Sequence, residues 1–254
     1  DAIKRVAAAV GRIQPAGGNA SFYIGSGTLV DGAERLILTN FHVVDQARRL
    51  HGIAMREDGG RLVVEGDLEI DFAGETGALD TRRFRITEIR LPQGAASVFA
   101  GVDAAVCKLE PLDEGVALAD AVMPLSASSD YATGEVTSLA LIGFPGEPAQ
   151  DKGDQVDWNF VVSELFGRRF GIKRLAPGRF RHGLGTHPKD LGKRAIGHDA
   201  TTFGGASGAL VVAWLDGGAP AFALHFGGET VESNYALSFA KARAVLEPLG
   251  VPFG

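Results

Sequence analysis

Short apolar stretches, each bounded by turn-forming residues, recur along most of this chain. They are roughly four to nine residues long and rich in Val, Ile, Leu and Phe, which is typical of β-strands and too short for helices. The expected strands are Phe22–Val30, Arg35–Thr39, Arg61–Val64, Phe84–Leu91, Ala104–Leu109, Val136–Phe144, Ala209–Leu215 and Ala221–Phe226. Because 35 glycines supply turns between them, the pattern predicts an all-β fold of antiparallel strands.

A helical period of apolar residues occurs only near the two ends of the chain. It predicts a short N-terminal helix within Ala2–Ile13 and a C-terminal helix within Ser238–Glu247, where Pro248 ends the pattern. Strands and helices do not alternate along the chain, so a doubly wound α/β fold is disfavoured.

One segment without regular periodicity divides the strands into two groups of similar number. Glu110–Thr133 contains Pro111, Pro124 and a serine cluster, which together indicate a linker. We expect two β-barrels, an N-terminal one in residues 1–115 and a C-terminal one in residues 125–254.

The composition is that of a globular protein that buries a sizeable core. Of the 254 residues, 45% are hydrophobic and 22% are charged, and the formal net charge is −6. Positive charge is concentrated in Glu164–His198, which holds nine Lys or Arg against two acids, so nucleic acid is not expected as a partner. The longest uninterrupted apolar run, Ala209–Leu215, has seven residues, and no membrane-spanning segment is expected.

A single cysteine, Cys107, leaves no internal disulfide to form, and its apolar surroundings predict a buried side chain. The lack of disulfides favours a cytoplasmic location, with the periplasm and secretion left open. Because the chain begins at Asp1 and shows no signal-peptide pattern, we expect a processed form or a domain of a longer protein.

A candidate nucleophile lies in the glycine-rich segment Gly204–Ala209, directly before an expected strand. A serine that projects from a tight glycine-built turn is well placed to attack a carbonyl carbon. Ser207 is that serine, and the backbone N–H groups of Gly205 and Ser207 are the expected donors to the oxyanion. The hexapeptide by itself fits an ordinary loop before a strand equally well.

A candidate base and a candidate acid precede the serine. His42 lies in the segment Leu38–Val44, and Asp103 opens the apolar strand Ala104–Leu109, where it could orient an imidazole and stabilise its protonated form. Three further acids lie between His42 and Ser207 and are ranked lower because none directly opens so apolar a strand. These are Asp67, Asp71 and Asp80.

Taken together, these segments resemble the trypsin-like serine protease family. The order His, Asp, Ser, with spacings of 61 and 104 residues, is the trypsin-like order. The run Gly25–Val30, followed by a short acidic turn and Ile37–Val44, resembles the family's histidine region, and Ile142–Gly146 resembles a segment common in bacterial members. The resemblance implies two antiparallel six-stranded barrels, a serine endopeptidase acting on proteins or peptides through an acyl-enzyme, and no cofactor.

Within that family the chain is most similar to the bacterial V8-like, or glutamyl endopeptidase, branch. There, a histidine on the strand after the nucleophile and a threonine five residues before the serine form a pocket for an acidic side chain. His225 and Thr202 match those positions, and Phe226 and Gly227 are the next expected substrate-binding residues. The resemblance implies cleavage after Glu or Asp; a pocket with other preferences remains the alternative.

Two further features bear on substrates and regulation. The basic segment Arg168–Arg194 precedes the nucleophile turn and either borders the substrate cleft or forms a solvated surface loop. Ala206 occupies the position where digestive proteases of the family carry an aspartate that pairs with a new N-terminal amine. Any control of activity is therefore expected from a further domain or a partner protein.

Other classes of protein fit the sequence less well. An α/β-hydrolase is disfavoured because Ala209 replaces the last glycine of the Gly-x-Ser-x-Gly motif and only 47 residues follow Ser207. A metal enzyme is disfavoured because three histidines of this chain lack the close spacing of zinc ligands. The three histidines are His182, His187 and His198. A catalytically inactive fold that serves as a protein-binding module remains the alternative to a protease.

Overall fold

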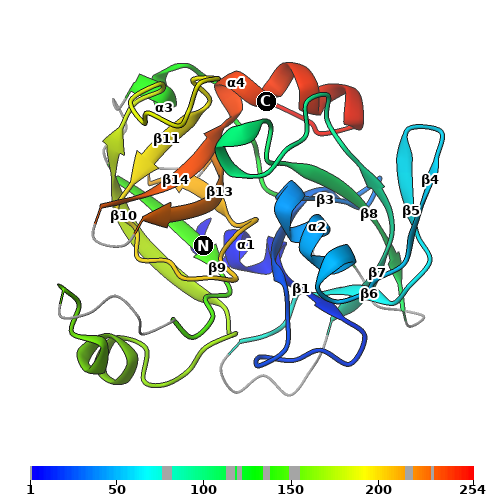
Figure 1. Ribbon diagram of the computed structural model, residues 1–254, viewed down its shortest axis with the longest axis horizontal. Coiled ribbons are helices and arrows are strands. Elements are labelled where there is room, and N and C mark those ends of the chain that lie inside the picture. Colours follow the sequence, from blue (N-terminus) through cyan, green and yellow to red (C-terminus); the bar gives the residue numbers. More distant parts are fainter. Residues whose placement is uncertain are drawn as a thin grey trace.

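The computed structural model describes residues 2–75, 82–112, 118, 122–133, 138–148, 155–214, 220–229 and 232–254. Two closed, six-stranded antiparallel β-barrels lie side by side in these residues (Figure 1), which confirms the all-β prediction. No helix in these ranges is long and apolar enough to cross a membrane.

The N-terminal barrel closes through the strand circuit β6–β1–β2–β3–β8–β7. The hairpin β4–β5 extends this sheet from β7 and projects from the barrel (Figure 1). The strands are β1 Val10–Pro15, β2 Gly25–Asp31, β3 Leu36–Thr39, β4 Met55–Asp58, β5 Arg61–Val64, β6 Leu68–Asp71, β7 Arg83–Arg90 and β8 Ala105–Pro111. Closure leaves the six barrel strands no open edge to pair with another chain.

The C-terminal barrel closes through β10–β11–β14–β13–β12–β9. Its strands are β9 Ser138–Gly143, β10 Arg174–His182, β11 Ala195–His198, β12 Leu210–Ala213, β13 Ala221–Glu229 and β14 Ser233–Ser238. The basic segment predicted either to border the cleft or to form a surface loop therefore contains a strand, β10. Side chains of β10 alternate between more and less exposed positions, so Arg179 and Arg181 lie on the outer face and Arg174 lies on the less exposed face.

Helices lie at both ends and beside the barrels. They are α1 Ala2–Ala9, α2 Phe41–Arg49, α3 Asp130–Thr133 and α4 Phe239–Leu246, with short helical turns η1 Val98–Ala100, η3 Phe160–Leu165 and η4 Glu247–Leu249. The C-terminal helix lies where the sequence predicts it. The predicted N-terminal helix is too long, because the chain leaves the helix at Ala9 and Val10–Pro15 pairs with both β2 and β6.

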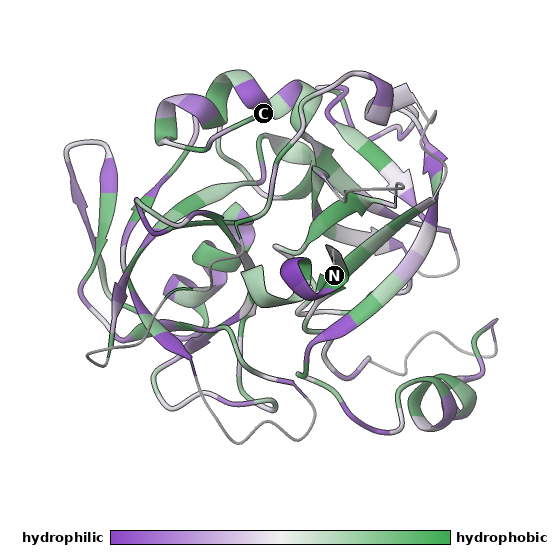
Figure 2. Cartoon of the chain, turned by 180° about the vertical axis from the view of Figure 1, so that it is seen from behind, coloured by the Kyte–Doolittle hydropathy of each residue, from purple (hydrophilic) through white to green (hydrophobic). Residues whose placement is uncertain are grey.

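A continuous apolar core joins the two barrels. It includes Leu29 and Ile37 of the N-terminal barrel together with Leu210 and Leu224 of the C-terminal barrel. Figure 2 shows hydrophobic residues concentrated on the barrel strands and helices. Cys107 belongs to this core, and burial raises the pKa of its thiol to about 12. Because interiors are close-packed, a shared core holds side chains from both barrels in a fixed relation.

Candidate active site

His42 stands in the first turn of α2, at the edge of the N-terminal barrel. The chain leaves β3 at Thr39, and Asn40 is the extended residue before the helix, with φ −81° and ψ 151°. The Asn40 side chain is buried, and its amide donates to the backbone carbonyl of Asp103 at 2.8 Å. The start of α2 is thereby fastened to the segment that carries Asp103.

Asp103 lies in the turn between η1 and β8, and its carboxylate accepts three hydrogen bonds. One oxygen accepts the backbone N–H of His42 at 3.0 Å, and the other accepts that of Val98 at 2.7 Å. The second oxygen also lies 2.7 Å from Nδ1 of His42. This contact orients the ring with its Nε2 atom available, and it requires the proton on Nδ1 because the carboxylate is an acceptor.

The competing acids have other neighbours. Asp71 is buried beside Arg12, at 3.7 Å, and accepts backbone N–H groups from Ala73 and Arg82. Asp67 is an exposed residue 3.6 Å from Arg85, and Asp80 lies outside the described residues. Of the three candidate acids that the structure describes, only Asp103 contacts His42.

Ser207 lies in the turn between β11 and β12, where the C-terminal barrel meets β2. The turn needs glycine at two positions, Gly205 and Gly208, because both have φ +90°. A Cβ atom on Gly208 would lie 1.9 Å from the backbone oxygen of Ser26. Ser26 N–H in turn donates to the carbonyl of Ser207 at 2.8 Å, so the serine is held directly against the N-terminal barrel.

The hydroxyl of Ser207 points to a backbone carbonyl rather than to His42. It donates to the carbonyl of Phe226 at 3.4 Å, which is long for a hydrogen bond from a hydroxyl. Among the described residues Ser207 and His42 form no hydrogen bond with each other. The structure therefore brings His42 and Asp103 into contact, while the Ser207 hydroxyl is bonded to Phe226.

The N–H groups of Gly205 and Ser207 have no hydrogen-bond partner within the described part of the chain. The carbonyl before each N–H is already occupied, because Gly204 O accepts from Gly146 at 2.6 Å and Ala206 O accepts from Ala209 at 3.0 Å. In a trans peptide the N–H points away from its carbonyl. Each N–H group therefore points to the opposite side of its peptide from the group that binds the carbonyl.

A buried serine fixes this turn further. The Ser26 hydroxyl donates to the carbonyl of Gly205 at 2.8 Å and accepts the N–H of Phe144 at 3.1 Å. Tyr23 donates its hydroxyl to the carbonyl of Phe144 at 2.8 Å. These bonds tie the nucleophile turn to β2 and to the end of β9, so that the turn is supported by both barrels.

His225 lies in β13 and forms a buried pair with His198 of β11. The Nδ1 atom of His225 lies 3.2 Å from Nε2 of His198, and both side chains are almost fully buried. Burial lowers the pKa of His198 to about 4. The pKa of His225 is also lowered well below its usual value, by burial first and then by the neighbouring charges of His198 and His42. Both rings are neutral at pH 7.

Thr202 pairs with an asparagine that sequence analysis did not single out. Its hydroxyl donates to Oδ1 of Asn234 at 2.8 Å, and the Asn234 amide donates to the carbonyl of Ala200 at 2.8 Å. Asn234 thus connects β14 with the segment before the nucleophile turn. Thr202 and His225 form no hydrogen bond with each other in the described residues.

The remaining predicted substrate-binding residues follow His225 along β13. Phe226 is buried, and its ring packs edge-on against Phe99 of η1, with ring centres 5.2 Å apart. Gly227 has open space where a side chain would begin. In β13, Phe226 therefore forms an aromatic contact with Phe99 of η1. Gly227 exposes its backbone, because no side chain of the described residues covers it.

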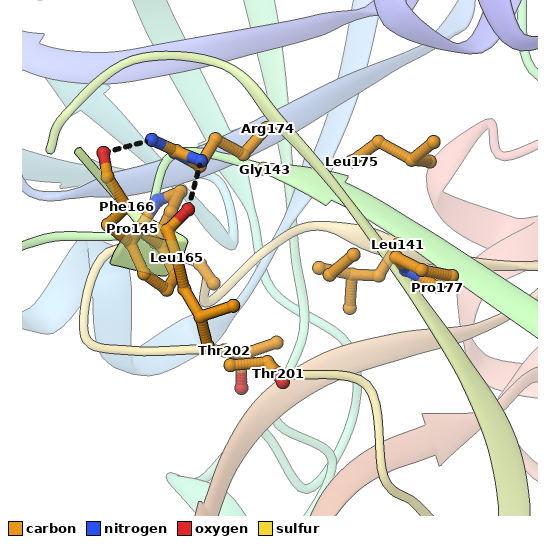
Figure 3. Close-up of a pocket in the computed structure, with 12 residues that line it drawn as sticks. Leu141, Gly143, Pro145, Leu165, Phe166, Arg174, Leu175, Pro177, Thr201 and Thr202 are labelled. Atoms are coloured by element: carbon orange, nitrogen blue, oxygen red, sulfur yellow. Dashed lines mark hydrogen bonds between the residues drawn. The ribbon is translucent and has the colours of Figure 1, made fainter. Parts of the chain in front are cut away.

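An apolar pocket of about 210 Å³ lies behind the nucleophile turn, bordered by Ala206, Thr201 and Leu141 (Figure 3). Arg174 is the charged residue in its lining, and its guanidinium is bound to the carbonyls of Leu165 and Phe166. No carboxylate lines this pocket among the described residues. The aspartate–amine pair of digestive proteases thus has no counterpart there.

Several residues that shape the site had no signal in the sequence. Ser26 and Asn40 lie inside the motifs Gly25–Val30 and Leu38–Val44, but their partners lie 179 and 63 residues away in the chain. The sequence suggests no role for His198 beyond a disfavoured metal site, and its partner His225 is 27 residues away. Only the barrel closure brings these pairs together.

Comparison with known proteins gives consistent matches. Residues 25–219 match the trypsin-like peptidase domain. Over 251 residues the chain is 59% identical to a probable serine protease of Lysobacter enzymogenes, and the alignment covers 99% of this chain and 65% of the length of that relative.

Solved structures show the same fold. The secreted serine protease VesC of Vibrio cholerae matches with a TM-score of 0.59 and 16% identity over 94% of this chain and 45% of VesC. An inactive form of Rv3671c from M. tuberculosis matches with a TM-score of 0.54 and 15% identity over 100% of this chain and 93% of that chain. Since the family match spans well over half of the residues, this chain belongs to the trypsin-like peptidase domain family.

Proposed function

We propose that this chain is the catalytic domain of a serine endopeptidase, with Ser207 as nucleophile, His42 as general base and Asp103 as the residue that orients His42. The observation that carries this proposal is the 2.7 Å contact between the Asp103 carboxylate and Nδ1 of His42, at the junction where Ser207 is tied to β2. A nucleophile, a base and an orienting acid are the parts that acyl transfer requires.

The proposed reaction begins when Ser207 Oγ attacks the carbonyl carbon of the scissile peptide bond. His42 takes the hydroxyl proton on Nε2, while Asp103 keeps the other ring proton on Nδ1 and stabilises the imidazolium. The N–H groups of Gly205 and Ser207 bind the oxyanion. The protonated His42 then gives its proton to the leaving amine, and water repeats the sequence to release the acyl group.

The serine must first leave its contact with Phe226. The 3.4 Å hydrogen bond is weak, so a rotation about the Cα–Cβ bond that turns Oγ toward His42 costs little. Catalytic hydrogen bonds are often long or misaligned without substrate and tighten in the complex. We infer that bound substrate completes the triad.

Labelling of the serine tests the proposed function. A fluorophosphonate probe should label the protein at Ser207, and Ser207→Ala should abolish the label. Asp103→Asn should slow the label strongly, whereas Asp67→Asn, which changes an exposed acid remote from His42, should not. If the protein is a binding module, no serine-dependent label will form although the Ser207→Ala variant is folded.

We further propose that the enzyme is V8-like in its specificity and cleaves after Glu or Asp, with Thr202 and His225 reading the acidic side chain. Asn234 donates one amide hydrogen to Ala200 and has a second that can donate to a carboxylate. The Thr202 hydroxyl can donate to a carboxylate once it leaves Oδ1 of Asn234, to which it is bonded in the empty site. His225 is neutral when the pocket is empty, and an adjacent carboxylate would raise its pKa. The His198–His225 pair would then accommodate a proton taken up with the substrate.

Matched peptides test this preference. Peptides that differ only in Glu, Gln, Leu or Arg at the cleaved residue should be turned over fastest with Glu. The ratio of kcat/KM for Glu over Gln should fall as pH rises, because the proton on the histidine pair is lost. Faster turnover of the Leu or Arg peptide would refute the acidic preference and leave the protease proposal intact.

A further inference from the structure

We propose that Arg168 and Arg169 form an anion-binding subsite for the half of the substrate that leaves first, so that the enzyme favours an acidic side chain shortly after the scissile bond. The inference rests on the proposed protease activity. It assigns a role to the part of the basic segment that lies beside the nucleophile turn.

The subsite is a cleft of about 690 Å³ next to the oxyanion turn. Gly204, Gly205, Tyr23 and Ile24 line it. Arg168–Phe170 complete its wall. The cleft therefore lies between the C-terminal barrel and the residues that directly precede β2. It is large enough for several atoms of a side chain and its backbone.

Its position relative to Ser207 indicates which half of the substrate it holds. The proposed acyl-side residues belong to a separate region and do not line this cleft; they are Thr202, His225, Phe226 and Gly227. Gly205 belongs both to the cleft and to the proposed oxyanion donors. A peptide whose carbonyl is bound by Gly205 and Ser207 would therefore enter this cleft with the residues beyond the scissile bond.

The backbone around the two arginines is fixed in an unusual conformation. After η3, Gly167 and Arg168 both have left-handed φ values, 55° and 54°. Arg168 N–H donates to the carbonyl of Val162 at 2.8 Å, and Arg169 N–H donates to that of Phe166 at 3.0 Å. A left-handed conformation is unfavourable for arginine and is retained where the surroundings enforce it, often at functional sites.

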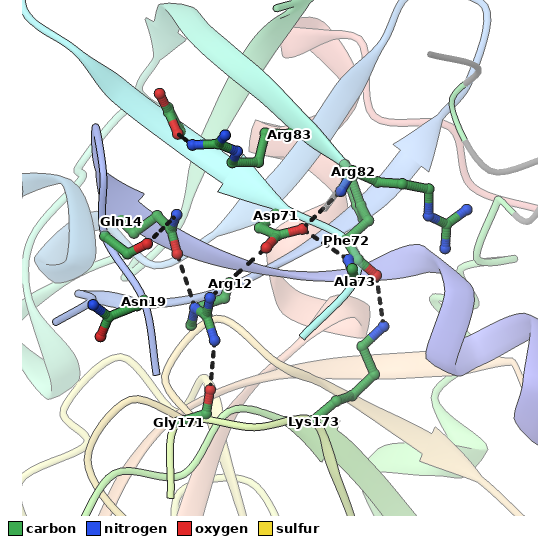
Figure 4. Close-up of polar contacts among 12 residues, drawn as sticks. Arg12, Gln14, Asn19, Asp71, Phe72, Ala73, Arg82, Arg83, Gly171 and Lys173 are labelled. Carbon is green, nitrogen blue, oxygen red and sulfur yellow. Dashed lines mark hydrogen bonds and ion pairs between the residues drawn. The ribbon is translucent and has the colours of Figure 1, made fainter. Parts of the chain in front are cut away.

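The segment that follows is clamped onto the N-terminal barrel (Figure 4). Arg12 donates to the carbonyl of Gly171 at 2.7 Å, and the ammonium group of Lys173 donates to Ala7 at 2.7 Å and to Phe72 at 2.9 Å. Gly171 passes so close to Ala20 that a Cβ atom would overlap its backbone oxygen. These contacts hold the cleft wall in place, as a preorganised subsite requires.

The charge in this region favours an anion. Arg174 donates a hydrogen bond to the carbonyl of Arg169 and so places a third guanidinium nearby. Two acids also line the cleft, but Glu75 lies 3.6 Å from Lys173, which offsets its charge. Glu147 remains as the opposing charge against Arg168 and Arg169. When Lys173 is counted with the two arginines and the two acids of the lining, the region carries one excess positive charge.

The test uses a peptide that the enzyme cleaves, found in an unbiased peptide mixture. Variants of that peptide carry Ala, Glu or Lys at the first, second or third residue after the scissile bond, with the acyl half unchanged. We expect kcat/KM for Glu to exceed that for Lys by roughly three- to tenfold at one of these positions, the range for one or two accessible ion pairs. The ratio should shrink in 0.5 M salt, where the Debye length is only about 4 Å.

Two variants decide the origin of this ratio. The double change Arg168→Gly and Arg169→Gln should abolish it, and the glycine relieves the left-handed strain at position 168 rather than adding to it. Arg35→Gly is the matched control, because Arg35 also has a left-handed φ, of 55°, but lies in the β2–β3 turn and does not line the cleft. The control should keep the full ratio.

Each outcome has a defined meaning. If the wild-type enzyme cleaves the Ala peptide but does not distinguish Glu from Lys, the anion subsite is refuted and the protease stands. A ratio that survives the double change also refutes it, because other groups then read the charge. If no peptide is cleaved and Ser207 takes up no fluorophosphonate, the protease proposal itself fails, and the subsite falls with it.

Discussion

Replacing Asp103 by asparagine gives the sharpest test of the proposed catalytic residues. The change keeps the size of the side chain and replaces one carboxylate oxygen by an NH₂ group. Both oxygens face N–H donors, one facing the backbone of His42 and the other facing Val98 and the His42 ring. Either orientation of the amide therefore sets an NH₂ group against at least one N–H.

The two orientations have different consequences for His42. If NH₂ faces the ring, it donates to Nδ1 and forces the ring proton onto Nε2, where the nitrogen can no longer accept a proton from Ser207. If the oxygen faces the ring, the ring is correctly oriented but the backbone N–H of His42 loses its partner. Loss of one such bond costs about 1–3 kcal/mol. That cost limits the fraction of molecules with the productive tautomer.

The expected magnitudes separate catalysis from stability. In a Ser-His-Asp triad the wrong tautomer lowers kcat by roughly 10³- to 10⁴-fold, equivalent to about 4–5.5 kcal/mol of activation free energy. The free energy of unfolding should fall by only about 1–3 kcal/mol, because the asparagine retains some of the three hydrogen bonds. The loss of rate should thus exceed what any loss of folded protein explains.

The assay combines turnover of a cleaved peptide, the rate of fluorophosphonate labelling and urea unfolding on the same preparations. Asp67→Asn serves as the control, because Asp67 is exposed and its contact is with Arg85 at 3.6 Å. A folded Asp103→Asn protein that retains more than a tenth of the wild-type turnover would show that Asp103 is not the orienting acid.

Other predictions follow from the same geometry. Gly208→Ala should destabilise the protein by more than about 2 kcal/mol and remove turnover, because the turn needs a left-handed residue with no Cβ. Urea unfolding measures the stability and fluorophosphonate labelling measures the activity of Ser207; wild-type values in both would contradict the assigned turn. Ser26→Ala should cost about 1–3 kcal/mol and slow turnover by releasing the Gly205 carbonyl. Thr28→Val, which removes a buried hydroxyl with no hydrogen-bond partner among the described residues, should change stability and turnover little. Because the pKa of His198 is lowered to about 4, the unfolded state binds more protons between pH 6.5 and 4, and this group should lower stability by about 3 kcal/mol as pH drops through that window. His198→Gln should make the loss seen in unfolding curves shallower but leave the part due to His225, whose pKa is also lowered, and an unchanged slope would rule out His198 as a source.

The amino-acid sequence determined the fold class and the core strands because these depend on local pattern. Runs such as Leu36–Thr39 and Leu210–Ala213 are buried throughout, and an unbroken apolar run signals such a strand directly. The glycines of the nucleophile turn were also visible, since a tight turn before a strand needs left-handed residues.

Some strands were hidden because their local signals were weak or misleading. Val10–Pro15 continues a helical period, yet it becomes β1 because pairing with β2 and β6 outweighs that local preference. Arg174–His182 contains Pro177, Gly178 and four basic residues, counting His182, so it reads as a loop. It becomes β10 because β9 supplies its hydrogen bonds while Arg179 and Arg181 face outward.

The contacts that make a site were decided only by tertiary structure. Sequence order singled out Ser207, His42 and Asp103, but three other acids competed until the fold showed which carboxylate lies against the His42 ring. The supports of the site, Ser26 to Gly205 and His198 to His225, join residues 179 and 27 positions apart. Hydrogen bonds depend on distance and angle in space, and closure of the two barrels sets those for residues that no local pattern connects.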